Sequence, residues 1–148
     1  MSFFKGHEIY SIDNKGRVNI PVKMRKELSP QANGTFTITR GYGKCIAAYP
    51  KDEWQRYAES YKKLNQFNGE ALFFLRTMLM WCEDVTLDAQ QRIAIPQKLI
   101  EFADIENKVV IAGVMDRIEI WNPVEFEKYK NSYSESFEDV ASKVMTVQ

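Results

Sequence analysis

The feature that most constrains the fold is a nine-residue motif that occurs twice in the chain. It runs from Asp13 to Pro21 and from Asp88 to Pro96, with arginine four residues after the aspartate and isoleucine-proline at the end. The offset between the copies is 75 residues here and becomes 72 further on. Pairs at the second offset are Gly41 with Gly113, Ile46 with Ile118, Tyr49 with Trp121, Glu53 with Glu125, Trp54 with Phe126 and Tyr57 with Tyr129. The chain is therefore an internal duplication whose first copy carries three extra residues, most simply in the loop 29–34.

The first motif has the pattern of a strand, a tight turn, a second strand and the start of a helix. Asp13 can accept hydrogen bonds from backbone N–H groups two residues on, and Gly16 supplies the positive φ of a tight reversal. Val18 and its alternate neighbours follow the period of a half-buried strand. The turn is expected to hold Lys15 and Arg17 on a small rigid platform, with a glycine between them that lets a ligand approach the backbone closely.

The second motif departs from the first inside the turn. Ala89-Gln90-Gln91 stands where the first copy has Asn-Lys-Gly, so both the lysine and the glycine are missing. This difference favours the first turn as the stronger binding element. The sequence leaves open whether Arg92 contacts a ligand or serves its own turn alone. For Arg17 the sequence favours contact with a ligand, and an intrachain ion pair with Asp13 is the alternative.

The rest of each copy repeats one order of elements and predicts an α+β fold. Strands are expected at 3–12, 18–20, 35–39, 45–49, 85–87, 93–95, 109–112 and 118–121. Helices are expected at 22–28, 50–64 and 70–81 and after Pro96 and Pro123, and Ser136 with Asp139 suggests a capped tail helix. The segments are then a first repeat at 1–64, an apolar connecting helix at 65–84, a second repeat at 85–135 and a tail at 136–148.

Charge is distributed unevenly although the net charge is zero. Residues 1–74 hold 12 Lys and Arg against 7 Asp and Glu, whereas residues 75–148 hold 8 against 13. Six of the basic residues lie between Lys5 and Lys26. Such asymmetry suggests that one half meets an anion, although charged stretches often only solvate a surface.

These motifs resemble the MraZ family, part of the AbrB-like swapped-hairpin superfamily. The resemblance rests on the two Asp-x-x-x-Arg motifs, each followed by an apolar residue, any residue and Ile-Pro, and on Thr39-Arg-Gly and Tyr49-Pro-x-x-Glu-Trp54. It covers about residues 6–129. It implies two tandem, pseudo-symmetric swapped-hairpin β units with packed helices, assembled into closed rings. Such proteins act mainly as bacterial repressors that bind short, G-rich direct repeats near the promoter of the division and cell-wall gene cluster.

Basic side chains near the turns are the candidate contacts to double-stranded DNA. Lys and Arg meet phosphates, and Arg can also donate two hydrogen bonds to one guanine. The predicted DNA-binding residues are Lys15, Arg17, Arg25, Lys26 and Arg92. The predicted turn-structuring residues are Asp13, Gly16 and Asp88.

Other functional classes have little support in the sequence. There is no nucleophile elbow, P-loop, zinc-protease or dinucleotide motif, so we expect no enzyme and no cofactor. Two distant cysteines and one histidine predict no metal site and a reducing compartment. Without a signal peptide or a long apolar run, we expect a cytoplasmic, nucleoid-associated protein with no membrane contact. An oligomeric scaffold and an antitoxin-like protein-binding module are the alternatives.

Overall fold

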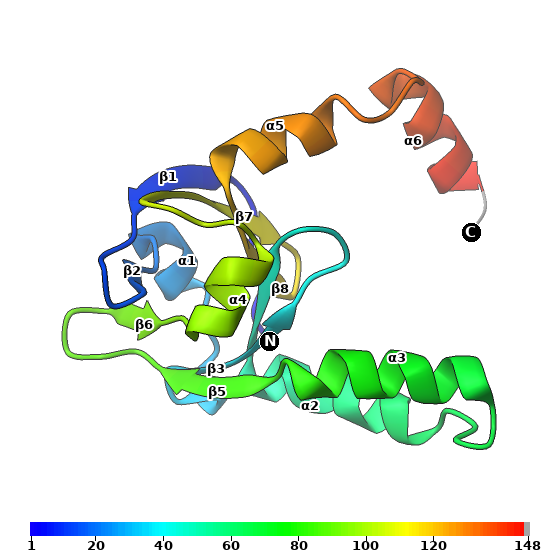
Figure 1. The fold of residues 1–148 in the computed structure, drawn as a ribbon, viewed down its shortest axis with the longest axis horizontal. Helices are drawn as coiled ribbons and strands as arrows, with labels where there is room; N and C mark the ends of the chain where they lie inside the picture. The colour runs from blue at the N-terminus through cyan, green and yellow to red at the C-terminus, as the bar shows by residue number, and fades with distance from the viewer. Residues whose placement is uncertain (147–148) are drawn as a thin grey trace.

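The computed structural model describes residues 1–146 (Figure 1). The strands are β1 (His7–Ser11), β2 (Arg17–Asn19), β3 (Thr35–Arg40), β4 (Ile46–Pro50), β5 (Glu83–Thr86), β6 (Arg92–Ala94), β7 (Lys108–Val114) and β8 (Arg117–Trp121). The helices are α1 (Val22–Lys26), a 3-10 turn η1 (Pro30–Ala32), α2 (Lys51–Lys62), α3 (Gly69–Met80), α4 (Gln97–Phe102), α5 (Pro123–Lys130) and α6 (Phe137–Thr146). The predicted elements are thus present, and residues 147 and 148 of the predicted tail lie outside the described residues.

The two repeats are interleaved in one antiparallel sheet. Its strand order is β1-β7-β8-β4-β3-β5, so β1 of the first repeat pairs with β7 of the second, and β5 of the second pairs with β3 of the first. At the centre β4 pairs with β8, its counterpart. This exchange confirms the α+β fold of two pseudo-symmetric units, each completing the other. The segment boundaries at 64, 84 and 135 stay predictions.

The strands of the duplicated motif form a separate two-stranded ribbon, β2–β6. Val18 is paired with Ile93, and both side chains are almost fully buried in the main core. The isoleucines that end the two motifs, Ile20 and Ile95, are buried in the same cluster. The apolar positions of the motif thus anchor the ribbon, and its alternate positions are left on the outside.

Two helical arms extend from the sheet on the side away from the ribbon. Figure 1 shows the α2–α3 hairpin and the α5–α6 segment reaching to the right, whereas β2 and β6 lie at the left. Three helices, α1, α2 and α4, have a proline as the N-cap residue: Pro21, Pro50 and Pro96. Proline is more usual one position later, at the first residue of the helix. None of the described helices is long and apolar enough to cross a membrane.

Candidate nucleic-acid interface

The first turn is built around the carboxylate of Asp13. Its Oδ1 accepts hydrogen bonds from the backbone N–H groups of Lys15 at 3.0 Å and Arg17 at 2.8 Å. The carbonyl oxygen of Asp13 accepts from the N–H of Gly16 at 3.0 Å, and Gly16 has a φ of +77°. The predicted roles of the aspartate and the glycine in shaping the turn agree with this geometry.

The same aspartate also holds the arginine side chain. Nε of Arg17 donates to Oδ2 of Asp13 at 2.7 Å, and both side chains are about one-third exposed. The intrachain ion pair, which was the alternative to ligand binding, is therefore present. A guanidinium has five N–H donors, and this contact uses only the one on Nε. In the described part of the chain no hydrogen bond engages the two terminal nitrogens of Arg17, so the outer edge of the guanidinium is available to a ligand.

The second turn has the same geometry despite its different sequence. Oδ1 of Asp88 accepts from the N–H groups of Gln90 and Arg92 at 2.9 Å each, and Oδ2 accepts from Nε of Arg92 at 2.9 Å. Gln91 adopts a φ of +63°, in the left-handed region that glycine occupies in the first copy. Losing the glycine therefore leaves the turn intact, and the second arginine is held in the same way as the first.

Each turn is hydrogen-bonded to the other repeat. The carbonyl of Gly16 accepts from the N–H of Ile95 at 2.8 Å, and the carbonyl of Gln91 accepts from the N–H of Ile20 at 3.1 Å. Gly16 is buried, and a Cβ built on it would lie 2.7 Å from the carbonyl oxygen of Ile95. The expectation that this glycine opens the backbone to a duplex is therefore wrong, because Gly16 faces the second repeat instead.

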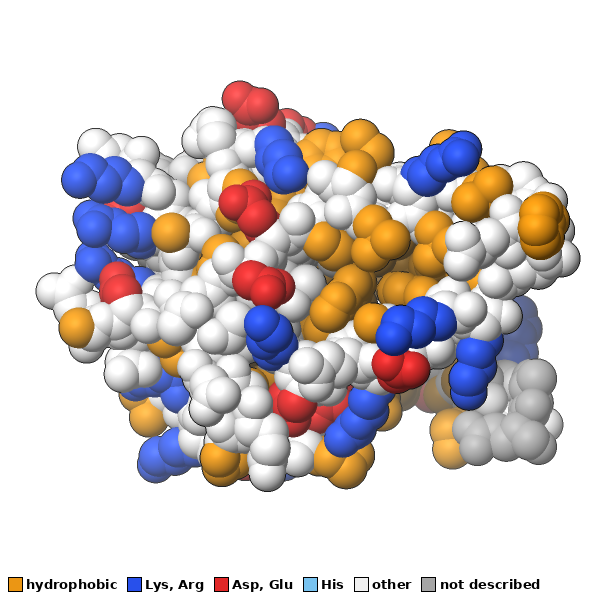
Figure 2. All heavy atoms as spheres, turned by 90° about the horizontal axis from the view of Figure 1, so that it is seen from below, with side chains coloured by type: hydrophobic (Ala, Val, Ile, Leu, Met, Phe, Trp, Pro, Cys, Tyr) orange, Lys and Arg blue, Asp and Glu red, His pale blue; other side chains and the backbone are white. Residues whose placement is uncertain are grey.

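The ribbon presents both arginines on one outer face. Arg17 is paired with Ala94, and Asn19 is paired with Arg92, so these four side chains point away from the core. The two arginines are diagonal neighbours, for which Cα atoms are about 7 to 8 Å apart in an antiparallel pair. Figure 2 shows Lys and Arg side chains gathered at the end of the molecule where Figure 1 places β2 and β6. The predicted residues Arg17 and Arg92 are thereby brought together.

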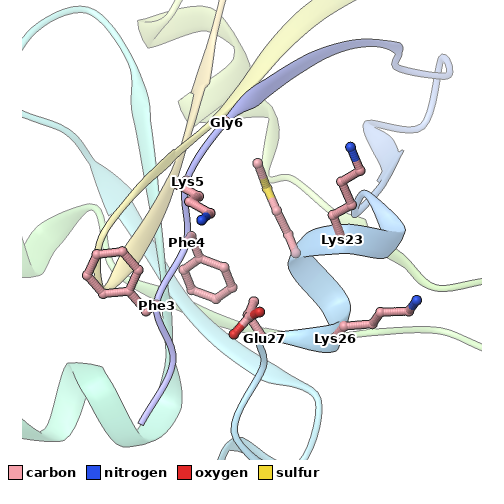
Figure 3. Close-up of a pocket in the computed structure, with 8 residues that line it drawn as sticks. Phe3, Phe4, Lys5, Gly6, Lys23, Lys26 and Glu27 are labelled. Atoms are coloured by element: carbon pink, nitrogen blue, oxygen red, sulfur yellow. The ribbon is translucent and has the colours of Figure 1, made fainter.

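The remaining predicted contacts lie beside the ribbon. Lys15 is exposed in the first turn. On α1, Lys26 is exposed and Arg25 is half-buried. This helix borders a hollow of about 700 Å³ lined by Phe3, Phe4, Lys5, Gly6, Lys23, Met24, Lys26 and Glu27. Figure 3 shows Lys23 and Lys26 extending from α1 on the side away from Phe4, so these lysines face outward rather than fill the hollow.

The turns keep both aspartates ionised. The backbone hydrogen bond from Arg17 is the main cause that lowers the pKa of Asp13, with further help from the Arg17 side chain and the Lys15 N–H. The same three kinds of contact, led by the backbone N–H of Arg92, lower the pKa of Asp88. Each arginine therefore lies beside an ionised carboxylate at neutral pH, which accepts a charge-assisted hydrogen bond from its Nε.

The side chains that could ligate a metal ion or act as a nucleophile are dispersed over the described structure. Within residues 1–146 no three His, Cys, Asp or Glu side chains gather where they could hold a metal ion. Cys45 is buried, and burial raises the pKa of its thiol to about 12. Burial also raises the pKa of Cys82. Both thiols therefore remain protonated at neutral pH and are poor nucleophiles.

Sequence reasoning missed the contact between Asn19 of β2 and Gln90 of the second turn. Nδ2 of Asn19 donates to the backbone carbonyl of Gln90 at 2.9 Å, which adds a further link between the two turns. The alternation of the strand places Asn19 on the outer face, and this pattern could have suggested exposure. Its partner could not have been inferred, because the contact depends on β2 pairing with β6.

The fold and the site define a tandem swapped-hairpin protein whose duplicated turns present two fixed arginines on one ribbon. The model of the MraZ protein family, which is also described as antitoxin-like, matches residues 3–77 and 78–147. The chain is 38% identical over 141 residues to the transcriptional regulator MraZ of Alkaliphilus oremlandii, covering 95% of this chain and 96% of the relative. It is 36% identical over 142 residues to the protein of the same name from Natranaerobius thermophilus, covering 96% of each. The chain belongs to the MraZ family, a family of transcriptional regulators rather than enzymes.

Proposed function

We propose that this protein regulates transcription by binding double-stranded DNA through the outer face of the β2–β6 ribbon. The observation that carries the proposal is the pair of arginines, Arg17 and Arg92, each fixed through Nε by the aspartate of its own turn. The duplicated motif repeats this arrangement, and the buried side chains of the ribbon, Val18 and Ile93, anchor it in the core. The names of the relatives agree with a regulatory role.

A two-stranded ribbon is one of the two elements that fit the major groove of B-form DNA. Arginine there donates two hydrogen bonds to O6 and N7 of guanine, which suits the G-rich sites expected for the family. Since Nε is occupied, the two terminal nitrogens of each guanidinium would make this contact. Lys15, Arg25 and Lys26 would contact phosphates beside the ribbon, and such contacts position a protein without reading sequence.

One ribbon makes few contacts, so the proposal includes a ring of subunits. Linked weak sites gain affinity because the second binding event becomes intramolecular. Short direct repeats near the promoter of the division and cell-wall gene cluster are the matching DNA, since each repeat would meet the ribbon of one subunit. Bound there, the ring would act as a repressor in the cytoplasm, in association with the nucleoid.

The alternative is an oligomeric scaffold or an antitoxin-like module that binds proteins, which the description of the family model mentions. Salt separates the two readings. A protein that neutralises phosphates releases counterions, so its affinity falls by about 0.9 logarithmic units per contact for each tenfold rise in salt. A scaffold would show no such dependence for DNA, because it would not bind DNA.

The test measures fluorescence anisotropy on duplex DNA from upstream of the organism's own division cluster, with a scrambled duplex beside it. Arg17→Ala and Arg92→Ala should each cost about 1 to 3 kcal/mol on the native site and relax discrimination against the scrambled site. Lys15→Ala should weaken binding to both duplexes equally and reduce the salt slope by about one.

Lys128→Ala is the matched control, because this lysine is exposed on α5, in the helical arm. It should bind as the unchanged protein does. The proposal fails if Arg17→Ala/Arg92→Ala, with its assembly intact by light scattering, retains the affinity and discrimination of the unchanged protein.

A further inference from the structure

An apolar groove runs between α2 and α3 in the lower helical arm. It has a volume of about 470 Å³ and is lined by Trp54, Ala58, Tyr61, Lys62, Gln66, Leu72, Leu75, Arg76 and Leu79. Figure 2 shows the apolar side chains gathered along this arm with Lys and Arg at the edges. On α3, Phe73 is 73% exposed and Leu79 is 51% exposed. The predicted apolar helix thus has more apolar surface than this chain covers.

A second uncovered apolar surface lies on α6. Phe137, Val140, Ala141 and Val144 have the spacing that places them on one face of the helix. Phe137 is 81% exposed and Val144 is 58% exposed. Val140 and Phe137 share only a shallow hollow with Tyr129 and Tyr133 at the end of α5. Figure 1 shows α6 beyond α5 and apart from the α2–α3 hairpin.

The two surfaces match in length and in charge. With a rise of about 1.5 Å per residue, the 10 residues of α6 extend about 15 Å and the 12 residues of α3 about 18 Å. Arg76 is exposed at the rim of the groove and has no ion pair within the described residues. Glu138 flanks the apolar face of α6 and likewise has no ion pair among residues 1–146. Docking would therefore bring a carboxylate to an unpaired guanidinium.

We propose that α6 of one copy docks into the α2–α3 groove of a second copy. The contact joins different surfaces of the two copies, so it is head-to-tail and generates a ring when the rotation closes. The proposal rests on the assembly named in the proposed function, for which it supplies the contact, and does not depend on how the ribbon reads DNA. No residue of the chain's own α6 lines the groove.

The first test reverses the charges of Arg76 and Glu138, singly and together. Light scattering across a dilution series then measures the mass of the assembly and its dissociation constant. Arg76→Glu and Glu138→Arg should each raise the dissociation constant of the assembly at least tenfold. The double variant Arg76→Glu/Glu138→Arg should restore it. Asp139→Arg is the matched control, because this residue lies in the same first turn but on the face opposite the apolar stripe, and it should leave the mass unchanged.

The second test needs no change in charge. A photoreactive phenylalanine analogue replaces Phe137 in the full chain, and isotopically heavy and light copies are mixed before irradiation. The expected product joins position 137 of one copy to residues 54–79 of the other. Cross-links within one copy, or to another part of the second copy, overturn the proposal.

The two proposals fail in different ways. If both single charge variants keep the mass of the unchanged protein, or if the double variant does not recover it, the docking proposal is wrong even where DNA binding is normal. If the charge exchange behaves as expected but Arg17→Ala/Arg92→Ala still binds DNA with full discrimination, the docking stands and the ribbon assignment falls.

Discussion

The two turns place different residues in the same strained backbone conformation. Gly16 and Gln91 occupy equivalent positions with φ of +77° and +63°. A left-handed conformation costs a residue with a Cβ roughly 1 to 2 kcal/mol. Replacing such a residue by glycine also makes the unfolded chain more flexible, which offsets roughly 0.5 to 1 kcal/mol. Gln91→Gly should therefore stabilise the protein by about 0.5 to 1 kcal/mol.

The reverse change at the equivalent position should be more costly than the backbone argument alone predicts. A Cβ on Gly16 would lie 2.7 Å from the carbonyl oxygen of Ile95 and 3.0 Å from Cδ1 of Ile100. Backbone must shift to relieve such overpacking, at roughly 1 to 3 kcal/mol. With the net conformational cost of about 0.5 to 1 kcal/mol included, Gly16→Ala should destabilise the protein by about 1.5 to 4 kcal/mol.

Gly6 provides the control that separates the two causes. Its φ is +79°, but a Cβ built on it would meet no atom within 4 Å. Gly6→Ala should therefore show the conformational cost alone, about 0.5 to 1 kcal/mol. Urea denaturation followed by circular dichroism, at one protein concentration because the protein assembles, gives the three free energies of unfolding. The reasoning is refuted if Gly16→Ala costs no more than Gly6→Ala, or if Gln91→Gly fails to stabilise.

Since the pKa values of Asp13 and Asp88 are lowered on folding from the ordinary value of 3.8, their contribution to stability is present above that value and lost as pH falls through the folded pKa. In the double variant Asp13→Asn/Asp88→Asn, stability should fall less steeply as the pH is lowered from about 5 to about 2. The urea denaturation midpoint, measured at each pH, gives this slope. Arg17→Lys should lose about 1 to 3 kcal/mol of discrimination for a G-containing site with little change on a scrambled duplex, because lysine lacks the planar fork. Iodoacetamide at pH 8 should modify Cys45 far more slowly in the folded protein than in urea, since burial raises the pKa of its thiol to about 12. Equal rates by mass spectrometry would contradict this.

Local patterns predicted the elements well because the local and tertiary preferences agree. Alternating Val18 and Ile20 define both a strand and its buried face. The Asp-x-x-x-Arg spacing defines a turn in which the side-chain hydrogen bonds of Asp13 all lie within five residues. Because the chain is duplicated, an element predicted in one copy could also be predicted at the equivalent residues of the other. This comparison predicted the second turn although Gln91 stands there in place of glycine, a residue that the local sequence alone would not favour in such a turn.

Contacts between the repeats could not be predicted in the same way. The sequence placed Gly16 toward a ligand, whereas it packs against Ile95 of the other repeat. The pairing of Asn19 with Gln90 depends on the same exchange of strands. Hydrogen bonds between residues more than 70 positions apart leave no periodicity in either segment. Similarly, the apolar pattern of 70–81 predicted an apolar connecting helix, but only the structure shows that its own chain leaves Phe73 and Leu79 exposed.

Because the strands of the two repeats are interleaved, Arg17 and Arg92 belong to one binding element rather than to two. Strand β2 carries Arg17 and is followed by Ile20, whose N–H donates to the carbonyl of Gln91. Strand β6 carries Arg92 and is followed by Ile95, whose N–H donates to the carbonyl of Gly16. A change in either turn therefore disturbs the strand that carries the other arginine. The two copies of the motif form one rigid platform rather than two independent binding elements, so mutations in the two turns should be coupled rather than additive. Repetition of binding sites then has to come from further copies of the chain, which is why the surfaces of the helical arms matter to the function of the ribbon.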